Sequence, residues 1–228
     1  MNSKLGDTTY LLFMRWVLVN TFGIVMLWVI WRAGWTSDII ATDSTYVARI
    51  IVLLFLSAVT GCTWRLLKTS HELNITREYT HCLKRKQFEV CEDIEVGNSR
   101  LASYLESIQG LDASEQRVIA DVFRMNMMHK ISSVGYNLNR LTMLGLIGTV
   151  IGMVLALKGF DPKVITDQTK IIELFRTVPP GLHNAVYATL VGSVAAFWLG
   201  YLFEILQNGT TQLVSEIIKA GVYRGRSE

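Results

Sequence analysis

Four long blocks of apolar residues limit the folds open to this chain more than any other feature of its sequence. The blocks are Leu11–Trp31, Val47–Leu67, Leu141–Leu157 and Leu182–Leu206. A helix that crosses the apolar core of a bilayer needs about 20 mostly apolar residues. The third block is slightly short but continues back into amphipathic sequence, and the fourth can span with tilt. The pattern predicts an all-α integral membrane protein with four transmembrane helices.

The first block must be distinguished from a secretory signal peptide. It is longer than the apolar part of a signal peptide, and no small-x-small cleavage motif follows Trp31. We therefore expect it to remain in the protein as a transmembrane helix.

Basic residues indicate the orientation of these helices. If the N-terminus is cytoplasmic, most of the 22 Lys and Arg residues fall on the cytoplasmic side, and such an excess sets the topology. Tryptophans lie near the ends of the blocks, as in the aromatic belts of a bilayer. They include Trp28 and Trp31 at one end of the first block and Trp64 at the end of the second block that would lie on the other side of the membrane. We expect both termini in the cytoplasm of a bacterial cell, with the helices in its inner membrane.

The segment 68–140 carries nearly balanced charge at helical spacing, which is typical of a solvated helical surface and not of a nucleic-acid site. The second helix is expected to continue to about Cys91, and residues 92–99 have the composition of a break. Asp112 and Glu115 have the spacing of a capping box, which predicts a new helix running into the third block. Its apolar face would comprise Val118, Ile119, Val122, Met125, Met128 and Ile131. These features predict a short helical stalk on the cytoplasmic side.

Between the third and fourth blocks, Lys170–Arg176 suits a short amphipathic helix on the outer interface. Pro179, Pro180 and Gly181 are expected to end it and to start the fourth span. Beyond Leu206, helical spacing continues to Gly221. The predicted organisation is transmembrane helices 1 and 2 in 1–67, the cytoplasmic segment 68–140, a channel region 141–206 and a cytoplasmic tail 207–228.

The third and fourth blocks share a pattern of small residues. In each block four Gly or Ala residues and one Thr recur at offsets 0, 3, 4, 7 and 11, which places them on one side of a helix. The two stripes are Gly145, Gly148, Thr149, Gly152 and Ala156, and Ala185, Ala188, Thr189, Gly192 and Ala196.

Two interpretations of these stripes are open. Small residues let helices pack closely, and each Thr hydroxyl can bond a carbonyl of its own helix. Alternatively, the stripes face another protein's helix, with Thr149 and Thr189 as the polar groups where an ion passes. A hydroxyl facing hydrocarbon is costly, and two matching ones favour protein or water as the neighbour.

Neither stripe contains a titratable group, although proton transfer through membranes normally uses a carboxylate or histidine relay. The only acid within the four blocks is Glu204, near the inner end of the fourth. If the chain conducts ions, a carboxylate is expected to come from a partner protein.

At these residues the sequence resembles the MotA/TolQ/ExbB proton-channel family. Leu144–Met153 is similar to the family's G-L-x-G-T-V-x-G-M element, and Pro180–Gly192 is similar to its P-G-I-x-x-A-L-x-A-T-x-x-G element. The resemblance covers roughly residues 141–206.

The resemblance implies a subunit of an ion-driven motor. Family members form pentamers around two copies of a single-span MotB-, TolR- or ExbD-like partner whose helix carries an Asp. It also implies an ion path beside Thr149 and Thr189, with the other members of the two stripes facing the pore. The processes driven in this family include flagellar rotation, outer-membrane energising, gliding and defence.

Several positions depart from the family pattern. Asn184 stands where TolQ and ExbB relatives usually carry Glu near the outer end of the ion path, and Glu204 stands where Asn is frequent. Thr142 and Trp198 each replace a Pro. Ala188 before Thr189 resembles proton-driven members more than sodium-driven ones, so the translocated ion is expected to be H⁺ rather than Na⁺.

Other function classes receive less support. The Cys and His residues lack metal-ligand spacing, and no catalytic or phosphate-binding motif is present, so we expect no metal, no cofactor and no enzyme activity. A helix-packing scaffold would account for the glycines but not for the paired threonines. A secondary transporter is disfavoured because no span is broken by Pro and the stripes hold no charge pair.

Overall fold

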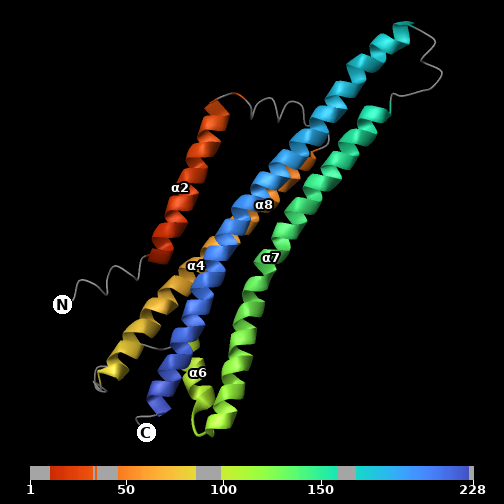
Figure 1. The fold of residues 1–228 in the computed structure, drawn as a ribbon. Helices are drawn as coiled ribbons and strands as arrows, with labels where there is room; N and C mark the ends of the chain where they lie inside the picture. Colours follow the sequence, from red (N-terminus) through yellow and green to blue (C-terminus); the bar gives the residue numbers. More distant parts are fainter. Residues whose placement is uncertain (1–10, 33, 35–45, 86–98, 159–167, 226–228) are drawn as a thin grey trace. The chain divides into compact units, whose positions relative to one another are not determined.

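The computed structural model describes residues 11–32, 34, 46–85, 99–158 and 168–225, and their regular elements are all helices (Figure 1). The helices are α2 (Leu11–Arg32), α4 (Val47–Lys84), α6 (Arg100–Ile108), α7 (Ala113–Leu157) and α8 (Gln168–Gly225). By length and composition α4, α7 and α8 can each cross a membrane, and α2 holds a shorter described apolar stretch, Phe13–Val29. The prediction of an all-α fold with long apolar helices is confirmed.

Helix α7 begins where its capping signal predicts. The backbone N–H of Asp112 donates to a carboxylate oxygen of Glu115 at 3.3 Å, and the N–H of Gln116 donates to the Asp112 carbonyl at 2.9 Å. These bonds use backbone groups that a helix N-terminus would otherwise leave unpaired. From this cap α7 runs without a break for 45 residues to Leu157, as the sequence predicts.

Helix α8 differs from the prediction at its N-terminal end. Pro179 and Pro180 lie inside one helix of 58 residues, so the prediction that they end a separate short helix is wrong. The fixed φ of proline is compatible with an α-helix, and what proline removes is a backbone N–H. The carbonyls of Phe175 and Arg176 therefore lack their usual helical donors. At its other end α8 continues past the predicted limit at Gly221 to Gly225.

Two of the predicted boundaries cannot be compared with the structure. The expected end of the second helix near Cys91 and most of the break at 92–99 lie outside the described residues. Within the described part of the chain, α4 ends at Lys84 and Ser99 caps α6.

The chain forms two compact units. Unit 1 comprises Met1–Leu18, Gly61–Ser133 and Leu202–Glu228, and unit 2 comprises Val19–Thr60 and Val134–Tyr201. Helices α2, α4, α7 and α8 each contribute a portion to both units.

In unit 2, the indole of Trp198 on α8 joins three helices. It occupies the space that a Cβ on Gly23 of α2 would need, and its ring meets Phe55 of α4 edge-on at a centroid distance of 5.8 Å. Residue 23 must therefore be glycine for α2 to lie against this indole. The sequence places an apolar helix here, but it does not pair Gly23 with a tryptophan so distant in the chain.

Unit 1 contains a core built from four helices. Buried apolar residues from α4, α6, α7 and α8 form one cluster, which comprises Leu73, Tyr79, Leu83, Leu101, Tyr104, Leu105, Ile108, Met127, Leu213, Val214, Ile217 and Ala220. On α7, Ile119 and Phe123 also pack against this core, whereas Val118 and Met125 remain 63% and 71% exposed. The apolar face expected from the sequence is therefore only partly a core face.

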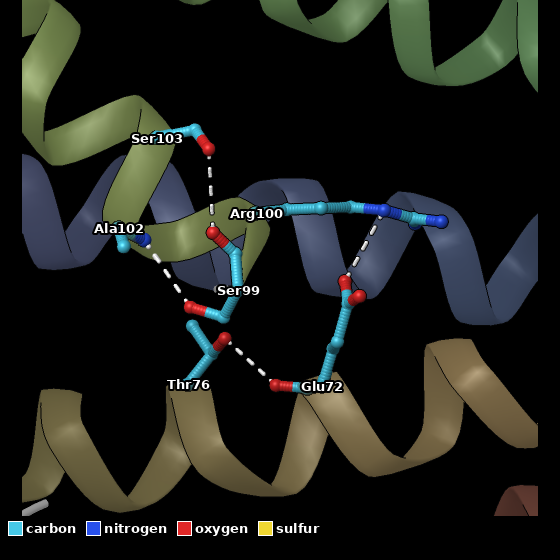
Figure 2. Close-up of polar contacts among 6 residues, drawn as sticks. All are labelled: Glu72, Thr76, Ser99, Arg100, Ala102 and Ser103. Atoms are coloured by element: carbon cyan, nitrogen blue, oxygen red, sulfur yellow. Dashed lines mark hydrogen bonds and ion pairs between the residues drawn. The ribbon is translucent and has the colours of Figure 1, made fainter. Parts of the chain in front are cut away.

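A buried ion pair connects α4 to α6 at the edge of this core (Figure 2). Arg100 Nε lies 3.2 Å from Glu72 Oε2, and the Glu72 side chain is only 10% exposed. Ser99 caps α6 by accepting a hydrogen bond from the Ala102 N–H at 3.2 Å, and the Thr76 hydroxyl donates to the Glu72 carbonyl at 2.8 Å. Because a buried carboxylate is costly without a charged partner, this pair fixes the start of α6 against α4.

We expect Glu72→Ala to lower the free energy of unfolding of the purified chain by about 1–3 kcal/mol, because the substitution leaves the half-buried Arg100 without its partner. Glu78→Ala, at an exposed position of the same helix, is the matched control and should change stability little. Denaturant unfolding in detergent measures both. Equal effects of the two substitutions would contradict a structural role for the ion pair.

Candidate functional site

In unit 2, α7 and α8 touch through their stripes of small residues. A Cβ added at Gly152 would lie 2.5 Å from the backbone N of Ala185, and one added at Gly192 would lie 2.9 Å from the Cα of Gly145. Both distances are too short for a real contact, so the two backbones come together only because these positions lack side chains. A larger residue at either position would have to push the helices apart.

The contacts follow a regular antiparallel order. As α7 advances from Gly145 to Ala156, its partners on α8 go back from Gly192 to Gly181. The contacting pairs are Gly145 with Gly192, Gly148 with Ala188, Gly152 with Ala185, and Ala156 with Gly181. In a single chain the small residues predicted to face a pore are therefore packed against each other.

The two threonines meet within this contact. Thr149 Oγ1 and Thr189 Oγ1 share a hydrogen bond, and each also lies near a carbonyl of its own helix. The distances are 3.0 Å from Thr149 Oγ1 to Gly145 O and 3.2 Å from Thr189 Oγ1 to Ala185 O. Thr189 Oγ1 is also 3.4 Å from Gly145 O, so this carbonyl lies near both hydroxyls. The sequence predicts the two threonines at matching depth, and the structure brings their hydroxyls together.

The hydroxyl pair lies at the edge of the α7–α8 contact. Thr149 is half-buried and Thr189 is exposed. Each hydroxyl carries one hydrogen and two lone pairs, so the pair has two hydrogens to share and keeps acceptor capacity after its internal bonds are made. The edge can therefore accept a hydrogen bond from a further group.

The exposed surface around Thr189 is otherwise mainly apolar. Val186 and Leu190 on α8 are 62% and 50% exposed. Ser193, one turn beyond Thr189, adds a second exposed hydroxyl. Polar groups on such a surface are costly against hydrocarbon, although bonds to their own helix reduce the cost.

The remaining predicted site residues lie elsewhere. Asn184 is buried, and its offset of five residues puts it on a different side of α8 from Thr189. Ala196 is half-buried on α8. Glu204 is exposed and belongs to unit 1, so the structure does not assemble it with the threonines in one compact unit.

Sequence reasoning missed the contribution of α4 to this contact. A Cβ on Gly148 would lie 3.0 Å from Val47 as well as meeting Ala188, so α4 packs beside the two stripes. The only sequence signal was that Gly148 is small.

Comparison with known families supports the site. Residues 114–219 match the model of the MotA/TolQ/ExbB proton channel family. This part of the chain is similar to that family over its whole matched length. The match includes Thr149, Thr189 and every contact between the two stripes, and it leaves out α2 and α4. No curated protein and no solved structure matches the chain.

The family match and the three long apolar helices together identify a multi-pass membrane protein. The resemblance inferred from the two sequence elements is thereby confirmed. The matched family is one of channels and not of enzymes.

A pair of Gly→Ala variants tests the close approach of α7 and α8. Gly152→Ala is expected to lower stability by about 1–3 kcal/mol, because the new methyl group would overlap the backbone of Ala185. Gly61→Ala in α4 is the control: nothing lies within 4 Å of its Cβ position, and alanine favours a helix by about 1 kcal/mol over glycine. Thermal unfolding in detergent should move in opposite directions for the two variants. If Gly152→Ala were as stable as Gly61→Ala, the close contact of α7 and α8 would be contradicted.

Proposed function

We propose that this chain is the proton-conducting subunit of a membrane motor that converts an ion gradient into mechanical work. The proposal rests above all on the hydroxyl pair of Thr149 and Thr189, which lies at the open edge of the helix contact matched by the channel family. Hydroxyls can pass a proton or replace part of the hydration of an ion, whereas the surrounding Val and Leu side chains can do neither.

The packing of the stripes supports a more specific role for the small residues. Their mutual contacts are enough to account for the glycines and alanines, as a non-conducting scaffold would also require. A scaffold does not account for Thr189, which is exposed although a valine there would suit an apolar environment better. In our proposal the stripes hold the two hydroxyls together and present them toward the pore.

A partner is part of this proposal. The sequences 134–158 and 178–201, which carry the contact, contain no Asp or Glu. We propose that a single-span protein of the MotB, TolR or ExbD kind supplies an aspartate, with two copies of its helix enclosed by a pentamer of this chain. Protons would move between that aspartate and the hydroxyl pair, and Ala188 before Thr189 favours H⁺ over Na⁺.

The proposed setting is the inner membrane of a bacterial cell. All four apolar blocks would span it, both termini would lie in the cytoplasm, and the segment 68–140 would form the cytoplasmic stalk. The end of unit 2 where the spanning part of α8 begins would then face outward. Moving one charge through 100 mV releases about 2.3 kcal/mol, so each step of such a motor must cross only small barriers.

Thr189→Val tests the hydroxyl pair. We expect proton flux through the chain, co-reconstituted with its partner in vesicles, to fall more than about tenfold, since valine keeps the shape but removes the hydroxyl. Thr142→Val is the matched control, because the Thr142 hydroxyl is exposed on α7 and bonds only to Leu138 O at 3.1 Å. Undiminished flux in Thr189→Val with an intact complex would remove Thr189 from the ion path.

Glu204 provides a second test. If its carboxylate assists proton release at the inner end of the fourth apolar block, Glu204→Gln should slow flux several-fold while the complex still assembles on size-exclusion chromatography. A carboxylate that only reaches toward the membrane surface predicts no change in flux. Flux that is unchanged in Glu204→Gln would exclude Glu204 from the path.

A further inference from the structure

The spanning part of α8 begins beside a hollow that the proposed function does not yet use. Its volume is about 670 Å³, and it is lined by Pro179, Pro180, Leu182, His183 and Val186. These residues occupy the first turns of α8 for which side chains are described. Among the described residues that line it, His183 alone has a polar side chain.

Two residues that line the hollow, Leu182 and Val186, lie along the same face of α8 as Thr189, whereas His183 lies about 120° further round the helix. Leu182 precedes Thr189 by seven residues and Val186 precedes it by three, and both offsets return to one side of a helix. All three residues are exposed. A small polar species in the hollow is therefore at one end of the surface that carries the Thr189 hydroxyl.

The two prolines also leave acceptors for water at this end of the helix. Because proline has no N–H, the carbonyls of Phe175 and Arg176 lack the donors that an α-helix normally supplies. Such carbonyls are normally satisfied by water or by other polar groups. Two carbonyls one helical turn before Pro179 and Pro180, which line the hollow, can thus bind water.

His183 is well suited to exchange protons with that water. It is exposed, and its ring stacks at a tilt on Tyr187 with a centroid distance of 4.4 Å. Histidine is the side chain that ordinarily changes charge between pH 5 and 8. In the stretches 134–158 and 178–201 it is the only residue of this kind, and neither stretch contains a carboxylate.

The described charged residues at the corresponding ends of the other helices of unit 2 are Arg32 of α2, Arg49 of α4 and Lys158 after α7, and Glu173 lies ten residues before His183 on α8. The titratable group in contact with His183 on its own helix is the phenol of Tyr187.

We propose that His183 is the proton-accepting residue at the outer mouth of the ion path, and this rests on the proposed function. Neutral imidazole takes a proton from a hydronium ion in the hollow, forming an N–H bond as an O–H bond breaks. The imidazolium then returns the proton to a water on the Thr189 side of the hollow. No other bond changes and no oxidant or reductant is needed.

The test uses His183→Ala and His183→Gln in the full chain co-reconstituted with its partner, with His129→Gln, an exposed position on α7 in unit 1, as the control. Proton flux is measured between pH 5.5 and 8, with and without added imidazole. We expect at least a tenfold loss of flux near neutral pH in both His183 variants, a flattened pH profile, and partial recovery of His183→Ala by imidazole. The control should behave as the wild type.

The outcomes separate the two proposals. Flux and a pH profile in His183→Ala and His183→Gln that equal those of the wild type would overturn the inference and leave the proposed function standing. A loss of flux that imidazole does not restore, with an unchanged pH profile, would make His183 a packing residue and would also overturn the inference. Wild-type complexes without any partner-dependent flux would overturn the proposed function itself.

Discussion

The near-contact of two backbones is the interaction on which the rest of unit 2 depends. Helices with ordinary side chains pack with their axes roughly 8–10 Å apart. Here glycine and alanine occupy the closest contacts between α7 and α8 in this unit, and at Gly152 and Gly192 there is no room for any side chain. The close approach brings Thr149 and Thr189 within hydrogen-bonding distance, so the polar feature of the site is a consequence of missing side chains.

The hydroxyl pair combines chemical capacity with a modest energetic cost. Each hydroxyl can bond a carbonyl of its own helix, which limits the penalty of placing it in an apolar surface. Each oxygen can also accept a hydrogen bond from a further group. Rotation of a hydroxyl about its C–O bond can reverse the direction of the hydrogen bond between the two oxygens. A fixed charge in the same place would bind an ion more strongly and would release it more slowly.

Much of the fold could be predicted because its signals are local. The length of the apolar blocks, the capping box at Asp112 and the regular spacing of the two stripes each specify structure within a few turns of helix. Pro179 and Pro180 were misjudged because proline is a helix breaker on average, while its fixed φ still permits continuation where lost hydrogen bonds can be replaced. The sequence also could not show that the stripes contact each other within one chain, because equal spacing is compatible with several partners.

Other features depend on residues far apart in the chain. Glu72 and Arg100 form a buried pair across two helices, and Trp198 fills the space above Gly23. Neither pairing has a periodic signature, and a lone glycine or a single buried acid is compatible with many neighbours. The pattern of burial on the first half of α7 could not be predicted either. Val118 and Ile119 are chemically similar, and they differ in burial because of where α6 and α8 pack.

The unbroken course of α8 has a structural consequence. At 1.5 Å per residue its 58 residues extend about 87 Å, nearly three times the apolar thickness of a bilayer. The exposed Thr189 and the buried residues Leu213, Val214 and Ile217 therefore belong to one helix. The backbone of α8 joins the hydroxyl pair to the core of unit 1 without an intervening loop.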